Sequence, residues 1–389
     1  MNPKKLFTIK GKSQIMYSNY YNFNSNFATP AIKIQPNAAT VPSTGYTPQQ
    51  IQTAYGFNQL YSQGYDGKGQ TIYIIDAYND PNIQADVKQF NSSFGLQQFN
   101  VAGGPTFTVA NPQGTPPNDS TSSKVWALEQ SLDVEWAHAI APGANIVLVQ
   151  AKSASLSDLF SAVDWAVQQK ASIVSMSWSI SESSSIVSYD SHFNVPNVAF
   201  FASAGDSATT IANYPATSPH VVSVGGTSLY LNSDNSWNSE TVWSNAGGGI
   251  SKYEALPNFQ KNYKLTYSGR SNPDVSYNAN PITGFAVYDS FDGKGLRSVG
   301  GTSAGAPQWA ALTALADHNR ATKGKGPLSS QSLSSGVRFD YQAAGASYSS
   351  YYHDIISGSS AYKATAGYDL ATGLGTPIAN SLVPYLANI

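Results

Sequence analysis

The chain contains no cysteine, so disulfides cannot hold its fold and thiols cannot indicate its redox compartment. Charged residues make up only 11% of the 389 residues, and 21 Lys and Arg against 23 Asp and Glu leave a formal net charge of −2. With few cations and no basic stripe, the sequence argues against a nucleic-acid partner. No apolar run approaches the roughly 18 residues of a membrane span, so we expect none.

A long amphipathic pattern begins only after residue 45. Residues 1–45 are rich in Asn, Ser, Tyr and Pro without a sustained period, which predicts an irregular leader or the remnant of a processed segment. The stretch 13–26 is polar where a signal peptide would be apolar, so no export signal is visible. We expect residues 46–389 to form one domain, because no repeat or interior linker interrupts them.

Apolar strands alternate with amphipathic helices through this domain. A short helical entry is expected from residue 48 to residue 60. The expected strands are 71–75, 145–149, 172–177, 198–202 and 221–224, and the expected helices are 82–94, 125–138, 156–168 and 308–316. This order predicts an α/β fold with a doubly wound parallel sheet, in which functional residues follow the carboxyl ends of strands.

A candidate nucleophile lies in the turn Gly-Gly-Thr-Ser-Ala-Gly-Ala-Pro over residues 300–307. The glycines before Ser303 allow close approach of backbone and substrate, and the helix start behind it offers unpaired N–H groups. The alternative is a strand-to-helix turn in which the serine only caps the helix.

No histidine is placed to activate this serine. His318 lies about 22 Å along the same helix, at about 1.5 Å per residue. His138 lies on the side of its helix opposite Glu129, and the other histidines, His192, His220 and His353, fall in loops. A triad based on histidine is therefore unsupported.

Carboxylates are better candidates for the base. Glu129 and Asp133 are four residues apart on one helix and share a face, so the pair should titrate as a unit that holds one proton to higher pH. A solvated acidic helix face is the alternative interpretation.

Two further aspartates follow strands. Asp206 lies after the strand 198–202, where a protonated carboxyl could donate a hydrogen bond to an oxyanion, although a turn aspartate would fit the same pattern. Asp76 follows the strand 71–75 at the place of a subtilisin-like triad aspartate. Without a matching histidine we interpret Asp76 as a structural loop acid.

Taken together, these segments resemble the sedolisins, serine-carboxyl peptidases with a subtilisin-like fold in which glutamate replaces histidine. The matching stretches are residues 47–56, 129–136, 141–144, 203–207, 214–219, 224–227, 247–249, 273–276, 300–304 and 366–377. Each motif is weak alone, but their order and spacing are specific. The resemblance covers the chain from about residue 47 to its end.

The resemblance implies roles for four residues. Ser303 would be the nucleophile, Glu129 the general base and acid, Asp133 the residue that orients Glu129, and Asp206 the oxyanion donor. Imidazole would be protonated at acid pH, whereas a glutamate of pKa ~4.3 is partly ionised there. We therefore predict an endopeptidase that cleaves polypeptides through an acyl-enzyme, with an optimum at roughly pH 3 to 5.

The resemblance also implies a calcium ion near the C-terminus. Asp354 and Asp369 bracket a glycine-rich loop, and two carboxylates with carbonyls suit Ca²⁺. On spacing alone a structured loop without metal fits equally well. The implied ligands are the carboxylates of Asp354 and Asp369, the carbonyls of Ile355, Thr365 and Gly367, and water.

For the substrate, the resemblance implies an extended peptide added as a strand along a cleft. Trp178, Gly248 and Gly249 are candidates to line that cleft, and for Trp178 a place in the core fits equally well. We expect a monomer, and the resemblance implies an extracellular location.

Two other interpretations stay open. The chain could be an inactive protein of the same fold that binds peptides, or a subtilisin-like hydrolase active at neutral pH. Sedolisins also carry a long folded pro-segment, whereas about 45 residues precede the resemblance here. Either the sequence is part of a longer chain or this member folds without that segment.

Overall fold

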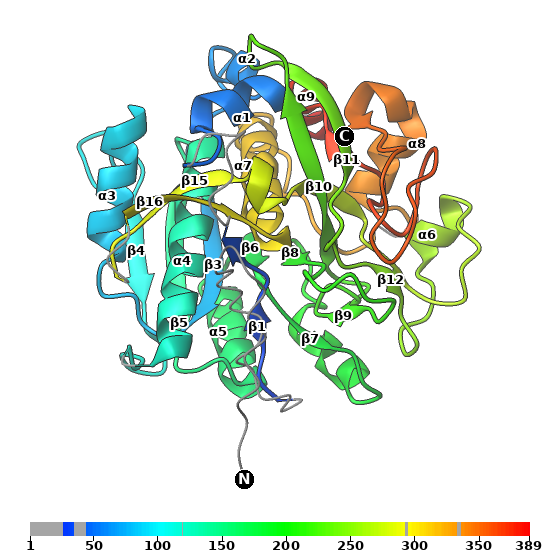
Figure 1. Cartoon of the computed structure of the whole chain (residues 1–389), viewed down its shortest axis with the longest axis horizontal. Helices are drawn as coiled ribbons and strands as arrows, with labels where there is room; N and C mark the ends of the chain where they lie inside the picture. Colours follow the sequence, from blue (N-terminus) through cyan, green and yellow to red (C-terminus); the bar gives the residue numbers. More distant parts are fainter. Residues whose placement is uncertain (1–25, 35–43, 119, 292–294, 333–335) are drawn as a thin grey trace, which may run out of the picture.

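The computed structural model describes residues 26–34, 44–118, 120–291, 295–332 and 336–389. Its centre is an eight-stranded sheet with strand order β11-β10-β8-β6-β3-β5-β4, and β14 also pairs with β10 (Figure 1). All pairings in this sheet are parallel except that of β11 with β10. The strands are β3 (Thr71–Ala77), β4 (Phe107–Ala110), β5 (Asn145–Ala151), β6 (Ile173–Met176), β8 (Ala199–Ser203), β10 (Val222–Leu231), β11 (Trp237–Val242) and β14 (Val275–Asn278).

Helices cover both faces of this sheet. One face carries α4 (Thr121–Ile140) and α7 (Gly305–Thr322), which contact each other and β3, and the opposite face carries α5 (Leu156–Gln168). The remaining helices are α1 (Pro48–Tyr55), α2 (Asn58–Tyr61), α3 (Ile83–Phe94), α6 (Asn258–Asn262), α8 (Phe339–Tyr351) and α9 (Ala379–Leu386). The doubly wound parallel sheet that the sequence predicts is confirmed in these elements.

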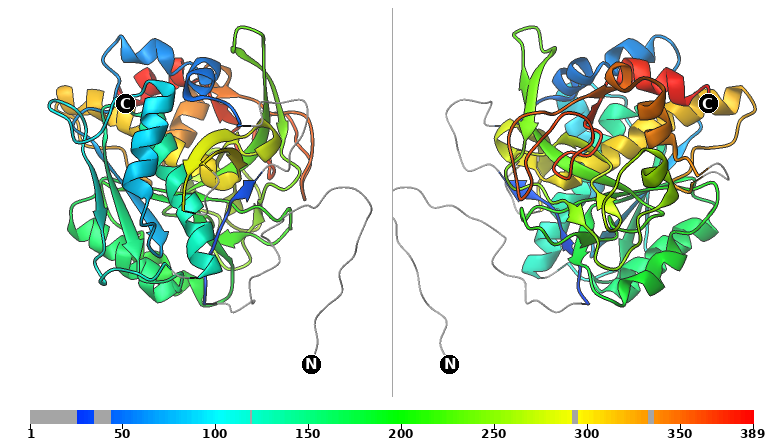
Figure 2. Two further views of the ribbon diagram at one scale, coloured as in Figure 1. Left: turned by 60° about the vertical axis from the view of Figure 1, so that its left-hand side comes forward. Right: turned by 90° about the vertical axis from the view of Figure 1, so that its right-hand side faces the viewer.

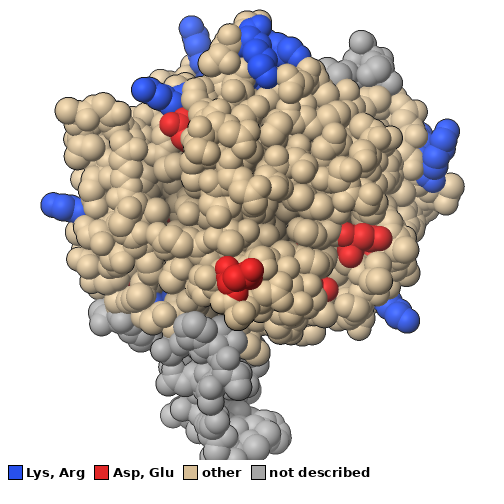
Figure 3. Space-filling view, turned by 90° about the horizontal axis from the view of Figure 1, so that it is seen from above, with Lys and Arg blue, Asp and Glu red and all other residues tan. Residues whose placement is uncertain are grey.

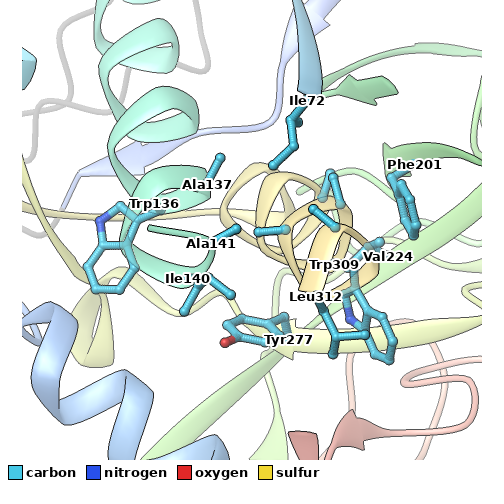
Figure 4. Packing of buried hydrophobic residues seen from close by; sticks show 14 of the residues in the cluster. Ile72, Trp136, Ala137, Ile140, Ala141, Phe201, Val224, Tyr277, Trp309 and Leu312 are labelled. Carbon is cyan, nitrogen blue, oxygen red and sulfur yellow. The ribbon is translucent and has the colours of Figure 1, made fainter. Parts of the chain in front are cut away.

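The larger core cluster joins α4, α7 and the sheet. Figure 4 shows Ala137 and Ile140 on the side of α4 that faces α7, Leu312 and Trp309 on α7, and Ile72 of β3 above them, while Trp136 lies on the other side of α4. Each of these side chains is almost fully buried. Helix α4, which carries Glu129 and Asp133, and helix α7, which follows the Ser303 turn, are thereby fixed against one sheet.

Several elements run further than the sequence predicts. Helix α4 begins four residues before 125, because Ser120 accepts a hydrogen bond from the Ser123 N–H (3.0 Å) and caps it. Strand β10 continues to Leu231, where it pairs with β11. The entry helix is divided into α1 and α2, since Gly56 has φ 84 and ends α1.

Two short strands lie within residues 1–45. Residues Thr29–Pro30 form β1, which pairs antiparallel with β7 (Trp178–Ser181), and Lys33–Ile34 form β2, which pairs antiparallel with β16 (Gly295–Gly300). The expectation of an irregular leader is therefore wrong for residues 29–30 and 33–34. Residues 1–25 and 35–43 of the leader lie outside the described residues.

Shorter strands complete the pairings: β9 (Asn213–Tyr214), β12 (Gly249–Ile250), β13 (Ser271–Asn272), β15 (Phe285–Asp289), β17 (Tyr352–His353) and β18 (Thr376–Pro377). Charged side chains are sparse and scattered over the face in Figure 3, as the low charged fraction of the sequence leads us to expect. Within the described ranges, no helix is long and apolar enough to cross a membrane.

Candidate active site

Ser303 lies between β16 and α7, in a short 3-10 turn, Thr302–Ala304, that follows Gly301. Gly301 has φ 121, and a Cβ there would collide with the Ala31 carbonyl oxygen and lie 2.7 Å from Asp206 Oδ2. Only glycine fits this approach. The Ser303 hydroxyl is buried and donates to the Ser177 carbonyl at 3.2 Å, and no side chain caps α7. The interpretation of Ser303 as a helix cap is therefore wrong.

Ser177 forms two hydrogen bonds with the candidate nucleophile Ser303. It follows the carboxyl end of β6, and its hydroxyl donates back to the Ser303 carbonyl at 3.2 Å. These reciprocal bonds fix the serine turn to the sheet. Sequence reasoning missed Ser177, although its position directly after a parallel strand was a usable signal.

Glu129 and Asp133 lie in the interior and do not form a solvated helix face. Both side chains are fully buried, and no carboxylate oxygen of either has a well-formed hydrogen bond among the described residues. Burial, then the charges of Asp133 and Asp76, raises the pKa of Glu129 well above its usual range, while the Ser303 hydroxyl lowers it. Burial and then Asp76 also raise the pKa of Asp133, and Ser177 lowers it. The structure thus brings the Glu129 carboxyl to the serine.

Asp76 belongs to this group of carboxyls. It lies within β3, beside the middle of the sheet, and is fully buried. Burial raises its pKa to about 8. The expectation of a structural loop acid is wrong, because Asp76 lies in a strand and its charge acts on both Glu129 and Asp133. The rule that functional residues follow strand ends pointed to it, and the missing histidine led us to set it aside.

Asp206 lies against the turn that carries Ser303. Its Oδ1 accepts from the Thr302 N–H (2.9 Å) and the Thr302 hydroxyl (2.8 Å), while Oδ2 is buried and has no hydrogen-bond partner among the described residues. Burial raises the pKa of Asp206 to about 6, against the lowering effects of the Thr302 N–H, the Lys33 charge and the Thr302 hydroxyl. Below that pH the carboxyl is protonated, and Oδ2–H can donate toward the turn that carries Ser303.

The histidines are engaged elsewhere. His138 contacts the Gln97 carbonyl at 2.7 Å, His192 pairs with Asp164 at 2.7 Å, and His318 lies 3.0 Å from Asp66. His220 bonds Gln331 at 2.5 Å, and His353 stacks on Trp237. None of the five forms a hydrogen bond with Ser303. Besides burial, the groups that shift the pKa of Glu129 are neighbouring carboxyls and the Ser303 hydroxyl.

The structure rules out one of the three residues expected to line a substrate cleft and leaves the other two untested. The Trp178 side chain is buried in the core, where its indole N–H donates to the Ile75 carbonyl at 3.0 Å, so it does not line a cleft. Its backbone, in β7, pairs with Pro30 of β1. Gly248 and Gly249 pack against the Leu370 and Thr210 carbonyls, and their place beside a substrate stays a prediction.

The C-terminal loop gathers both predicted calcium carboxylates. Asp354 accepts from the Gly367 N–H (3.0 Å), and Asp369 accepts from the N–H groups of Thr365 and Thr372 (each 2.8 Å). Among the described residues no group of three His, Cys, Asp or Glu side chains could hold a metal. Carboxylate oxygens are ligands that Ca²⁺ prefers, but two carboxylates do not fill its coordination shell, so backbone carbonyls would have to supply further ligands.

The fold and this site define a class of protein. The sequence profile described as "Subtilase family" matches residues 121–325, which hold Glu129, Asp206 and Ser303. A solved lanthipeptide protease shares the fold, with a TM-score of 0.55 at 16% identity, and the match covers 87% of this chain and 95% of that one. The subtilisin-like fold is therefore confirmed.

Similar proteins of known family identify a narrower group within the subtilases. The chain is 31% identical to kumamolisin of a Bacillus species over 91% of its own length and 66% of that protein. It is 25% identical to sedolisin of a Pseudomonas species over 91% of its length and 64% of that protein. A solved Pseudomonas sedolisin, described as a serine-carboxyl proteinase in complex with pseudo-iodotyrostatin, superposes with a TM-score of 0.74 at 25% identity, over 88% of this chain and 98% of that one. The chain belongs to the sedolisin family of subtilases, and it spans slightly less than two thirds of these two curated relatives.

Proposed function

We propose that this protein is a serine-carboxyl peptidase that cleaves polypeptides at acid pH. The single observation that supports this most is the burial of Glu129 beside Ser303, in a site where the nucleophile has no histidine partner. A serine becomes a nucleophile only when a neighbouring base takes its proton, and Glu129 is the group in position to do so. Membership of the sedolisin family agrees with this assignment.

The four candidate residues would share the work as follows. Glu129 accepts the Ser303 proton as the hydroxyl attacks the substrate carbonyl and then delivers it to the leaving amine. Asp133, with Asp76 behind it, holds and orients the protonated Glu129. The Ser303 N–H and the protonated Asp206 carboxyl donate to the oxygen of the tetrahedral intermediate. Water then hydrolyses the acyl-enzyme by the same proton transfers in reverse.

The pH dependence follows from two opposite requirements. Asp206 donates only while protonated, so activity should fall as the pH rises through about 6. On the acid side, one proton must leave the group formed by Glu129, Asp133 and Asp76. Like charges this close repel, so the first charge forms at a lower pH than the second and third. Burial raises the pKa of Glu129. We therefore expect the rise of activity on the acid side of the pH–rate profile to occur at a higher pH than the pKa of a free glutamate, on which the sequence-based prediction rested.

Replacing Asp206 by asparagine should separate the donor role from its titration. An asparagine in the same place accepts from Thr302 through Oδ1 and donates through Nδ2 at every pH. We expect Asp206→Asn to keep part of the activity and to lose the decline near pH 6. Asp206→Ala should lose about 10²- to 10³-fold in kcat at all pH values.

The measurement is a pH–rate profile on an unfolded protein substrate, with circular dichroism at each pH to confirm folding. An Asp206→Asn profile that still falls near pH 6 would contradict the assignment. Activity of the unchanged chain that rises toward pH 8 would instead favour a neutral subtilisin-like hydrolase. A folded chain that cuts no substrate at any pH would favour the inactive peptide-binding alternative.

We also propose a calcium site in the C-terminal loop, held by the carboxylates of Asp354 and Asp369 and the carbonyls of Ile355, Thr365 and Gly367. A bound cation would neutralise two carboxylates that lie against one loop and would tie residues 354–369 together. We further propose, from the family, that the protein works outside the cell.

Removing the cation should lower thermal stability, since a ligand bound only by the folded state stabilises it. We expect a chelator to lower Tm by about 5 °C in the unchanged chain and to leave the Tm of Asp354→Asn unaffected. Scanning calorimetry with and without chelator measures both. An equal response of the two proteins, or no response of the unchanged chain, would count against calcium at this loop.

A further inference from the structure

The residue before the candidate nucleophile is bonded to the candidate oxyanion donor. Helix α7, in yellow to gold, packs beside β8, in green, in the middle of the molecule (Figures 1 and 2). At the start of α7 the fully buried Thr302 contacts Asp206, in the loop after β8, through two groups. Its N–H lies 2.9 Å and its hydroxyl 2.8 Å from the same carboxyl oxygen, Oδ1. The Thr302 side chain therefore acts on the carboxyl of Asp206.

A backbone group sets the direction of the Thr302 hydroxyl proton. The Gly205 N–H donates to Thr302 Oγ1 at 3.0 Å. A backbone N–H can only donate, so this bond uses a lone pair of the hydroxyl oxygen and the hydroxyl proton points elsewhere. Asp206 Oδ1 is the other hydrogen-bond partner of Thr302 Oγ1 among the described residues, so the proton points to Oδ1.

Gly205 is itself held in place by its neighbours. Its carbonyl accepts from the Gly247 N–H at 2.7 Å. A Cβ on residue 205 would collide with the amide of Asn213, which donates to the Ala204 carbonyl at 3.0 Å. With φ 103 as well, this position requires glycine. The N–H that orients the Thr302 hydroxyl is thus fixed by the loop that carries Asp206.

These bonds make the two oxygens of the Asp206 carboxyl different. Oδ1 accepts from the N–H and from the hydroxyl of Thr302, so a proton on Oδ1 would face two donors. Oδ2 is buried and has no hydrogen-bond partner among the described residues. A neutral carboxyl carries its one proton on one oxygen, and here Oδ2 is the oxygen left free to hold it.

Oδ2 faces the place where a substrate carbonyl would lie. A Cβ on Gly301 would lie 2.7 Å from Asp206 Oδ2 and would collide with the Ala31 carbonyl oxygen, so both oxygens lie on the open side of Gly301. The same carbonyl accepts from the Ser303 N–H at 3.2 Å. A proton on Oδ2 therefore points into the space that the proposed mechanism gives to the oxyanion, whereas a proton on Oδ1 would be directed at Thr302.

We propose that Thr302 is a positioning residue that decides which oxygen of Asp206 carries the catalytic proton. Its hydroxyl, oriented by the Gly205 N–H, occupies Oδ1 and leaves the proton on Oδ2, where it donates to the oxyanion of the substrate. The inference rests on the peptidase function proposed above. It adds a residue that acts on the substrate only through Asp206.

Removing the Thr302 hydroxyl should have two effects of opposite sign. Burial raises the pKa of Asp206 to about 6, while the Thr302 N–H, the Lys33 charge and the Thr302 hydroxyl each lower it. Without the hydroxyl this pKa should rise, so the alkaline decline of activity should move to higher pH. The proton is then no longer confined to Oδ2, so kcat should fall. A loss of packing alone would lower kcat without moving the decline upward.

The acid side of the profile provides an internal reference. It belongs to Glu129, whose pKa is raised by burial, Asp133 and Asp76, and only after these by Asp206. We expect its position to change less than that of the alkaline decline when Thr302 is replaced.

The test is a pH–rate profile on an unfolded protein for three variants of the full chain. Thr302→Val keeps the branched shape and removes the hydroxyl. We expect about tenfold lower kcat, a smaller loss than removal of the oxyanion donor itself, and a decline displaced above about pH 6. Thr302→Ser keeps a hydroxyl and should restore kcat to within about threefold, with the decline back in its place.

Thr313→Val is the matched control on α7. Thr313 is fully buried, and its hydroxyl has no hydrogen-bond partner among the described residues. The same chemical change at this position should alter neither kcat nor the alkaline decline. Circular dichroism and the melting temperature show whether each variant is folded.

A double-mutant cycle separates positioning from a general effect on the fold. In the Asp206→Ala background, Thr302→Val should change kcat less than about twofold, because the carboxyl through which Thr302 acts is absent. An equal tenfold loss in both backgrounds would overturn the inference.

Neutron diffraction from crystals of the unchanged chain tests the proton directly and does not depend on how any variant folds. The crystals are kept at about pH 4 to 5, below the pKa of Asp206. We expect a deuteron on Asp206 Oδ2 and the Thr302 deuteron directed at Oδ1. A deuteron on Oδ1 would overturn the inference.

The outcomes distinguish the role of Thr302 from the peptidase function. An active chain in which Thr302→Val changes neither kcat nor the alkaline decline contradicts the role of Thr302 and leaves the peptidase function standing. A folded chain that cuts no unfolded protein between about pH 3 and 8 contradicts the peptidase function, and the role of Thr302 with it.

Discussion

Ser303→Ala should abolish turnover of unfolded protein, with kcat falling by about 10⁶-fold, the magnitude found when the nucleophile of a subtilisin-type triad is removed. The hydroxyl supplies the attacking oxygen in the proposed mechanism, while the backbone N–H of the same residue, which donates to the Ala31 carbonyl at 3.2 Å, remains to bind the oxyanion. Substrate binding should therefore persist, and Kd for a non-cleaved peptide should change little.

A matched control for this variant is Ser175→Ala. Ser175 is buried in β6 near the site, and its hydroxyl has no hydrogen-bond partner among the described residues. We expect this variant to keep near-normal kcat and a similar melting temperature. Residual turnover of Ser303→Ala above one part in a thousand, with contamination excluded by mass spectrometry, would show that another group is the nucleophile.

Glu129→Gln should lower kcat by about 10⁴-fold or more, because the amide keeps the shape of the side chain but cannot accept the serine proton. The change removes a charge from a fully buried site where burial and neighbouring carboxyls already disfavour it, so folding should not suffer. KM should change less than kcat, since the interaction with the serine matters most in the transition state.

Glu135→Gln provides the matched control on the same helix. Glu135 is also fully buried, and burial raises its pKa, but its carboxylate accepts from the Tyr288 N–H and lies near Asp86, Asp289 and Asp80. Its kcat should stay within a few-fold of the unchanged chain. Equal losses in the two variants, measured at matched folded fractions by calorimetry, would show that Glu129 acts through stability and not as the base.

Ser303, Glu129 and Asp133 could be predicted from sequence because their local signals are strong. A glycine-rich turn before an alanine-rich helix presents Ser303, and the four-residue spacing of Glu129 and Asp133 places both on one face of α4. The alternation of strands and helices likewise predicted the parallel sheet, because the spacing of apolar residues along consecutive positions distinguishes a helix from a strand.

The spacing of residues in the sequence could not predict the surroundings of these carboxyl groups. Whether Glu129 and Asp133 point to water or to the interior depends on how α4 packs against the sheet and against α7, which involves contacts far apart in sequence. Asp76 joins their group because β3 lies in the middle of the sheet, between β5 and β6. A single strand pattern carries no information about its neighbours in the sheet.

The strands of the leader, too, could not be predicted from the local sequence. Its sequence has no sustained period, because residues 26–34 form strands only by pairing with β7 and β16, which begin more than 140 residues later. By itself the sequence determined which residues could serve as nucleophile, base and oxyanion donor. Only the tertiary structure decided that the Glu129 and Asp133 carboxyls are buried beside Ser303, that Asp76 lies with them, and that the peptide bond after Ala31 lies on the serine turn. These facts depend on long-range packing, and local residue patterns do not encode it.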